Sequence, residues 1–171
     1  MVSPLVGIGQ ARPYVRWAVR TLLVPTLLSA DLPLPAEVIL VPKDGPPMAV
    51  VTAAQASALS GEAARELAAM IGAITGRRPE LRSGDGTAGV AVGTVTEFPL
   101  LNAAIRLDTN DFLHGDDHLL LSHTNGLLLI GATPTAARHA VWSFLDRLGY
   151  RRFFPAPKWE IIPRHAELRV W

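Results

Sequence analysis

Apolar residues in segment 64–74 recur at the three- and four-residue spacing of an amphipathic helix. Ser60 precedes this stripe and predicts an N-cap, and Glu62 is expected in the first turn, where the helix dipole favours an acidic side chain. Gly76 follows the stripe and predicts the end of the helix, because glycine readily adopts the left-handed conformation found there. The pattern predicts one helix between Ser60 and Gly76 that buries a single face.

A second apolar stripe, over residues 137–148, has the same spacing. Thr133 is a natural N-cap, and Pro134 fits the first helical position, where its missing N–H has no partner to lose. Gly149 predicts the end of this helix, with Arg147 in its last turn. We expect this helix to pack on a sheet.

Short apolar runs without helical spacing predict strands. Asn125-Gly126 separates two of them and is a strong hairpin signal. The run that follows it has no polar alternation, so we expect it to lie inside a sheet with both faces buried. A short helix is expected over residues 96–104, and residues 150–154 are strand-like before an extended tail rich in proline. The predicted strands are 38–41, 49–52, 89–93, 118–122 and 127–130.

The alternation of strands and helices predicts an α/β or α+β fold, a single domain with a mixed β-sheet and helices packed mainly on one face. The length of 171 residues fits one domain. Hydrophobic residues make up 49% and charged residues 18%, a balance that excludes a disordered chain. The sequence contains no cysteine, which excludes disulfides and thiolate metal ligands.

The N-terminal segment has the order of a secretory leader. Arg12, Arg16 and Arg20 precede an uncharged apolar run, residues 21–30, that ends in small residues. We therefore predict a signal or leader over residues 1–30, a proline-rich linker over 31–37 and an ordered domain over 38–171. If the leader is genuine, the protein is exported to the periplasm or the extracellular space; otherwise we expect it in the cytoplasm.

Charge and hydropathy exclude several classes of partner. Sixteen basic and fifteen acidic residues give a net charge of +1, so no global field attracts nucleic acid. The longest uncharged stretch, 118–137, is interrupted by the Asn125-Gly126 turn and does not predict a membrane span. No nucleotide or metal motif is complete, and we expect no cofactor. No serine lies in a G-x-S-x-G motif, which leaves little basis for a nucleophilic triad.

Two groups of residues are candidates for chemistry. His114, His118 and His123 lie near two aspartates and offer zinc-type ligands, but along a strand and its turns they do not share one face. The favoured interpretation of this segment is therefore a solvated loop before a hairpin, with no metal. The second group contributes aromatic rings and guanidinium groups for contact with a ligand or a neighbouring domain, since sugars stack on rings and Arg binds hydroxyls or carboxylates. Its members are Trp142, Arg151, Arg152, Phe154 and Trp159.

Several segments together resemble one known module. The run Leu148-Gly149-Tyr150-Arg151-Arg152-Phe153-Phe154-Pro155, followed by Trp159-Glu160 and Pro163, is the most specific part. Residues 63–76, 90–93 and 129–133 contribute softer matches, and the order covers residues 38 to 170. The chain thereby resembles the N-terminal accessory domain of α-glucuronidases, β-N-acetylhexosaminidases and related uncharacterised bacterial glycosidase-like proteins.

The resemblance implies a hexosaminidase domain-2-like fold that precedes a (β/α)8 catalytic barrel. In that family catalysis belongs to the barrel; hexosaminidases use an Asp-Glu dipeptide there, and this chain contains none. We therefore expect a non-catalytic accessory domain of a carbohydrate-active protein that supports a barrel in cis or in a partner chain, with no catalytic residue of its own. Two alternatives stay open: a stand-alone carbohydrate-binding module that takes an oligosaccharide, and a small metal-dependent hydrolase using the three histidines.

Overall fold

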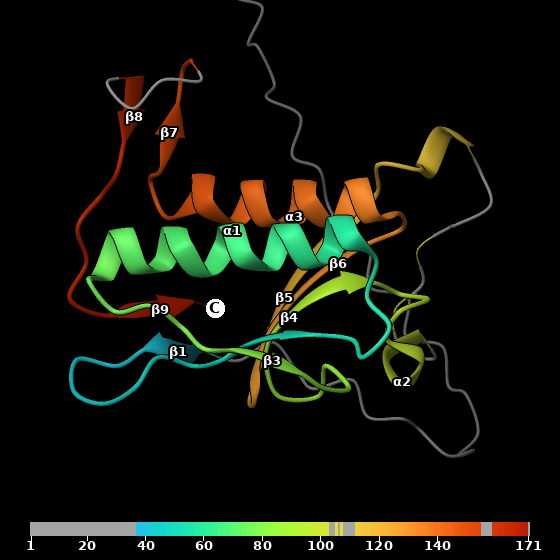
Figure 1. Cartoon of the computed structure of the whole chain (residues 1–171), viewed down its shortest axis with the longest axis horizontal. Coiled ribbons are helices and arrows are strands. Elements are labelled where there is room, and N and C mark those ends of the chain that lie inside the picture. Colours follow the sequence, from blue (N-terminus) through green and yellow to red (C-terminus); the bar gives the residue numbers. More distant parts are fainter. Residues whose placement is uncertain (1–36, 103–104, 106, 108–111, 155–158, 171) are drawn as a thin grey trace, which may run out of the picture.

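A five-stranded sheet forms the centre of the fold (Figure 1). The computed structural model describes residues 37–102, 105, 107, 112–154 and 159–170. The strand order is β3-β2-β4-β6-β5; the first four strands are parallel, and β5 is antiparallel to β6. The strands are β2 (Val50–Thr52), β3 (Leu81–Ser83), β4 (Gly89–Thr94), β5 (His118–His123) and β6 (Gly126–Gly131).

The hairpin and the interior strand predicted around Asn125-Gly126 are confirmed. His123 of β5 pairs with Gly126 of β6, and β6 lies between β4 and β5 with every residue buried. Full burial explains why its sequence is apolar throughout, because both faces of an interior strand contact other layers. Strand β3 was not predicted, because its short sequence Leu-Arg-Ser is exposed and has no apolar pattern.

Two long helices lie side by side on one face of the sheet (Figure 1). They are α1 (Ala58–Thr75) and α3 (Pro134–Arg147). Their predicted apolar stripes are buried against the sheet in one core, in which Leu67, Ile71 and Leu145 are almost fully enclosed. For α3 the predicted start is confirmed, since the Thr133 side chain accepts a hydrogen bond from the backbone N–H of Ala136. The fold is therefore mixed α/β with the helices mainly on one face of a mixed sheet.

The predicted start of α1 is wrong by one turn, although its end at Gly76 is confirmed. The N-cap is Ser57, whose side chain accepts from the backbone N–H of Ser60, so Ser60 is the third helical residue. Glu62 consequently lies beyond the first turn, which contains no acidic residue. At the other end Gly76 is left-handed, with φ of 75°. Both Ser57 and Ser60 are acceptable caps by type, and their tertiary contacts determine which one is used.

The opposite face of the sheet carries a smaller apolar layer. Phe98 is fully buried there and packs with Val95, Leu128 and Ile130. The helix predicted for residues 96–104 is shorter than expected among the described residues: α2 covers Pro99–Asn102, and residues 103–104 lie outside the described part. A 3-10 turn, η1 (Phe112–His114), precedes β5.

Two small antiparallel pairs lie outside the main sheet, contrary to the expectation of one sheet and an extended tail. Strand β1 (Val38–Val41) pairs with β9 (Leu168–Val170), so the two ends of the described chain meet. Strand β7 (Arg151–Arg152) pairs with β8 (Glu160–Ile161) and projects beyond the two long helices (Figure 1). The strand-like segment 150–154 thus contributes only two residues to a ladder.

The leader predicted for residues 1–30 lies outside the described residues, as does the 31–37 linker apart from Glu37. Among the helices that the structure describes, none is long and apolar enough to cross a membrane.

Candidate functional site

An open groove lies where the end of α3 meets β7. It has a volume of about 590 Å³, and its walls include Trp142, Ser143 and Arg147 of α3 together with Tyr150 and Phe153. Trp142 and Tyr150 stack at a tilt, with ring centroids 5.6 Å apart and an interplanar angle of 39°. Burial raises the pKa of the Tyr150 phenol, as does nearby Glu160, so this ring stays neutral at physiological pH. The groove therefore has an aromatic wall and a polar rim.

The two arginines proposed from the sequence both lie at this groove, but each guanidinium group already has partners. Arg151 Nη1 is 2.7 Å from Asp146 Oδ1 and also donates to the backbone carbonyls of Asp146 and Tyr150. Arg152 Nε is 3.4 Å from Glu160 Oε1 across the β7–β8 pair. The Arg151 contacts hold the start of β7 against the end of α3, and the Arg152 contact joins β7 to β8. These contacts use Nη1 of Arg151 and Nε of Arg152, so an acidic side chain already compensates part of the charge of each guanidinium group before a ligand binds.

The remaining two residues proposed from the sequence lie apart from the groove walls. Phe154 and Trp159 face each other edge to face at the far end of the β7–β8 pair, with ring centroids 5.4 Å apart. They are 61% and 47% exposed, and their neighbours Phe153 and Ile161 are also more than half exposed. The five candidate residues thus divide into a groove set and an exposed apolar set. Phe154 and Trp159 belong to a larger exposed apolar surface, which we call the hairpin patch; it consists of Phe153, which also borders the groove, with Phe154, Trp159, Ile161 and Ile162.

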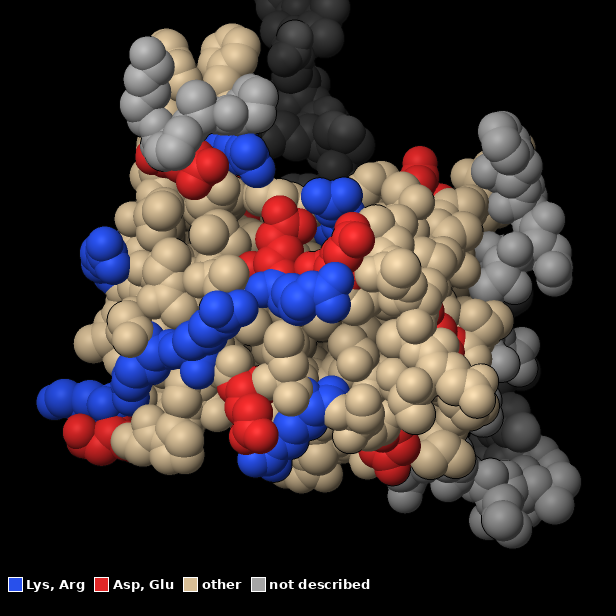
Figure 2. All heavy atoms as spheres, in the orientation of Figure 1, with Lys and Arg blue, Asp and Glu red and all other residues tan. Residues whose placement is uncertain are grey.

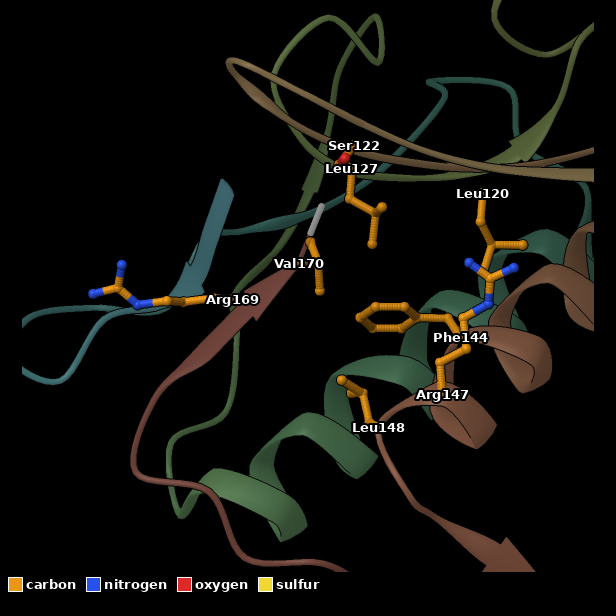
Figure 3. Close-up of a pocket in the computed structure, with 8 residues that line it drawn as sticks. All are labelled: Leu120, Ser122, Leu127, Phe144, Arg147, Leu148, Arg169 and Val170. Carbon is orange, nitrogen blue, oxygen red and sulfur yellow. The ribbon is translucent and has the colours of Figure 1, made fainter. Parts of the chain in front are cut away.

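A smaller apolar cavity of about 240 Å³ lies between α3, the β5–β6 hairpin and β9 (Figure 3). Phe144 points into it, and Leu127 and Val170 face it from the sheet and from β9. The Arg169 side chain points away from the cavity, toward Glu37 and Glu167. Arg147 extends from α3 toward Leu120 on β5, and no ion pair joins it to any described residue. Arg147, which sequence analysis did not select, therefore borders both this cavity and the groove.

A third hollow, of about 520 Å³, opens beyond the C-terminal ends of β2 and β4. Open α/β sheets commonly bind ligands at this edge, and the N-terminus of α1 adds free N–H groups that attract anions. Here the Glu97 carboxylate takes that position. It accepts hydrogen bonds from the backbone N–H of Ser57 at 2.7 Å and of Thr94 at 2.8 Å, and from the Ser60 hydroxyl at 2.9 Å. The chain thus supplies its own anion at this helix end.

The three histidines considered as metal ligands do not come together. His114 Nδ1 is 2.9 Å from Asp117 Oδ2, and His118 turns toward α3, where its Nε2 is 3.0 Å from Ser143 Oγ. His123 is 3% exposed at the end of β5, and its Nε2 has no hydrogen-bond partner among the residues that the structure describes. Within the described residues, no three His, Cys, Asp or Glu side chains form a group that could hold a metal ion. The metal-dependent alternative therefore has no support in this part of the chain.

The adjacent acids Asp116 and Asp117 also diverge. Asp116 Oδ1 is 3.7 Å from His139 Nδ1, whereas Asp117 contacts His114. Basic and acidic side chains alternate on the face that carries α1, as Figure 2 shows, and Arg138 of α3 lies 3.5 Å from Glu66 of α1. The visible face therefore presents mixed charge rather than a basic surface suited to nucleic acid.

In comparisons with known proteins, no family model and no curated protein sequence matches this chain.

Proposed function

We propose that this chain is an accessory domain of a carbohydrate-active protein, and that it supports a (β/α)8 catalytic barrel in cis or in a partner chain without cleaving glycosidic bonds itself. The observation that carries this proposal is the hairpin patch. Its aromatic and aliphatic side chains are exposed on a two-stranded projection, whereas the two cores of the domain are closed. A concentrated apolar surface of this kind is typical of contact with another folded unit.

The physical chemistry of the patch favours a protein surface as its occupant. Aromatic residues that become fully covered dominate the stability of protein interfaces, and truncation of such a residue commonly costs about 2 kcal/mol or more. The ion pair Arg151–Asp146 links β7 of the projection to α3, and Arg152–Glu160 joins the two strands of the projection to each other. A projection whose strands are paired and linked to α3 loses less conformational entropy on docking than an unpaired segment would, which suits an architectural contact.

The first test is enzymatic. The purified chain is expected to show no hydrolysis of aryl glucosides, aryl N-acetylglucosaminides or aryl glucuronides. The proposal fails if the chain hydrolyses one of these and loses that activity when a single acidic residue, such as Asp116→Asn, is changed.

The second test locates the interface. Oxidative footprinting by mass spectrometry compares this domain alone with the domain in the presence of its proposed (β/α)8 barrel, supplied in cis or as a separate chain. Phe153, Phe154 and Trp159 are expected to become protected, while exposed Leu100 on α2 keeps its labelling and serves as the internal control. Unchanged labelling of all three aromatic residues beside a folded barrel would contradict the proposed docking.

The groove favours a second candidate function, a stand-alone carbohydrate-binding module. Trp142 is half-buried at the groove and packs on Tyr150, which is 3% exposed, so the accessible part of the indole lies next to polar groups, where a sugar ring can stack. Titration of Trp fluorescence with oligosaccharides and uronic acids should then show saturable quenching that is lost in Trp142→Ala and kept in Trp159→Ala. The reverse result would place the sugar on the hairpin patch, and no response to any glycan would remove this candidate.

A further inference from the structure

A serine and a histidine that lie far apart in the sequence meet between β5 and α3. Ser143 Oγ on α3 is 3.0 Å from His118 Nε2 on β5. The other ring nitrogen of His118, Nδ1, is 3.1 Å from the backbone carbonyl oxygen of Asp116. Because a carbonyl oxygen only accepts, the contact assigns the proton to Nδ1, and in that tautomer Nε2 is an acceptor. The Ser143 hydroxyl therefore donates to Nε2, the arrangement in which an imidazole activates a nucleophile.

The geometry also separates His118 from its neighbouring imidazole. His139 lies one helical turn before Ser143, and its ring centroid is 6.5 Å from that of His118. The Asp116 carboxylate faces His139 Nδ1 at 3.7 Å, while the Asp116 carbonyl faces His118. Asp116 thus orients His118 through its backbone. His118 is the histidine that contacts the serine, and His139 is a close exposed neighbour that does not.

The surroundings of Ser143 are those of a binding site rather than of a flat surface. Ser143 lines the groove of about 590 Å³ whose aromatic wall is Trp142 and Tyr150. Arg147 is one turn further along α3, lines the same groove and has no ion-pair partner among the described residues. Its side chain extends toward β5, the strand that carries His118 (Figure 3). A free guanidinium beside a nucleophile can stabilise negative charge that develops on a carbonyl oxygen.

We propose that Ser143 and His118 form a nucleophile–base pair that hydrolyses short-chain carboxylic esters bound in this groove. Ser143 Oγ attacks the ester carbonyl carbon while its proton passes to His118 Nε2, and the oxyanion faces Arg147. The bond from the carbonyl carbon to the alcohol oxygen then breaks, and that oxygen takes the proton from Nε2. Water attacks the acyl–serine with His118 again as base, which releases the carboxylic acid and restores the hydroxyl. The balance is ester plus water to acid plus alcohol.

This activity goes beyond the accessory role, in which the domain docks through the hairpin patch and does not cleave glycosidic bonds. Its test uses other residues, so either proposal can fail alone. The measured reactions are hydrolysis of p-nitrophenyl acetate and covalent labelling by an alkyl fluorophosphonate. We expect one label per chain, located on Ser143 by peptide mass spectrometry. Hydrolysis should fall at least about tenfold in Ser143→Ala and in His118→Gln, since a positioned general base typically contributes about 100-fold or more. The matched control His139→Gln should stay within about twofold of the unchanged protein.

A cysteine variant gives a second, independent measurement. The chain contains no cysteine, so Ser143→Cys introduces a single thiol whose alkylation by iodoacetamide can be followed directly. Its rate at neutral pH should exceed that of Thr135→Cys, an exposed position on the same helix, and should fall when His118→Gln is added. Equal ester hydrolysis by the unchanged protein and by Ser143→Ala, fluorophosphonate labelling spread over other residues, or thiol reactivity independent of His118 would each overturn the proposal. Circular dichroism and the thermal midpoint verify that every variant is folded.

Discussion

Glu97 holds the start of α1 against the end of β4, and its removal should weaken the whole domain. The half-buried carboxylate accepts from the Ser57 and Thr94 backbone N–H groups and from the Ser60 hydroxyl at both of its oxygens, at 2.9 and 3.1 Å. Thr94 and Ser60 are almost fully buried, so water has little access to these donors when the acceptor is absent. The contact therefore joins two elements that the chain brings together from forty residues apart.

The expected loss of unfolding free energy in Glu97→Ala follows from the number of donors that lose their acceptor. A hydrogen bond to a charged group contributes about 1.5–3 kcal/mol, and a buried donor left without an acceptor costs about 1–3 kcal/mol. Because Glu97 is partly exposed, water replaces some of what is lost, and we expect Glu97→Ala to lower the free energy of unfolding by about 2–4 kcal/mol. Glu97→Gln keeps the shape of the side chain and one acceptor oxygen, but it turns an NH2 donor toward some of the groups that donate to Glu97. Its loss of unfolding free energy should therefore be about half that of Glu97→Ala.

Urea unfolding followed by circular dichroism measures these changes, with the slope of the transition used to verify two-state behaviour. Glu80→Gln is the matched control, because Glu80 is exposed and forms its ion pair with exposed Arg82. It should leave the free energy of unfolding unchanged within error. A loss below about 1 kcal/mol in Glu97→Ala, with an unchanged slope, would refute the reasoning, since it would mean that water satisfies these donors as well as the carboxylate does.

Three further predictions concern particular contacts. Burial lowers the pKa of the His123 imidazole, so as the pH falls the unfolded state binds a proton at a higher pH than the folded state does. The free energy of unfolding should therefore fall as the pH drops below about 6.5, the pKa in the unfolded state, and His123→Leu should remove that part of the pH dependence of urea unfolding. A Cβ on Gly131 would collide with the backbone of Ala136 and Ala137, so Gly131→Ala should lower the free energy of unfolding by about 1–3 kcal/mol. Gly61 lies in the first half of α1 with room for a Cβ, so Gly61→Ala should raise the free energy of unfolding by about 0.5–1 kcal/mol. Thr133→Ala should lower the thermal midpoint through loss of about 1 kcal/mol of N-cap energy, and Thr133→Ser should restore most of it.

The helices and the interior strand could be predicted because their signals are local. The stripe 137–148, the Thr133 cap and the Asn125-Gly126 turn are each contained within a few neighbouring residues. The pairing of β1 with β9 could not be predicted, because no local pattern indicates that residue 38 meets residue 170. The prediction of Ser60 instead of Ser57 as the N-cap of α1 failed for the same reason. The choice between them depends on the Glu97 carboxylate, which the fold brings to the helix end from a different element.

In the candidate site too, residue types could be predicted from the local sequence, whereas the contacts between distant residues could not. Aromatic and basic residue types drew attention to segment 142–159, but composition could not show that Arg151 and Arg152 already have acidic partners while Arg147 has none among the described residues. Nor could it pair Ser143 with His118, which are twenty-five residues apart and share no motif. A catalytic pair of this kind is recognised by geometry rather than by sequence spacing. The decisive quantity for this protein is therefore the reactivity of Ser143 with and without His118, because a purely structural hydrogen bond between β5 and α3 would change the thermal midpoint on mutation but not the rate of acyl transfer.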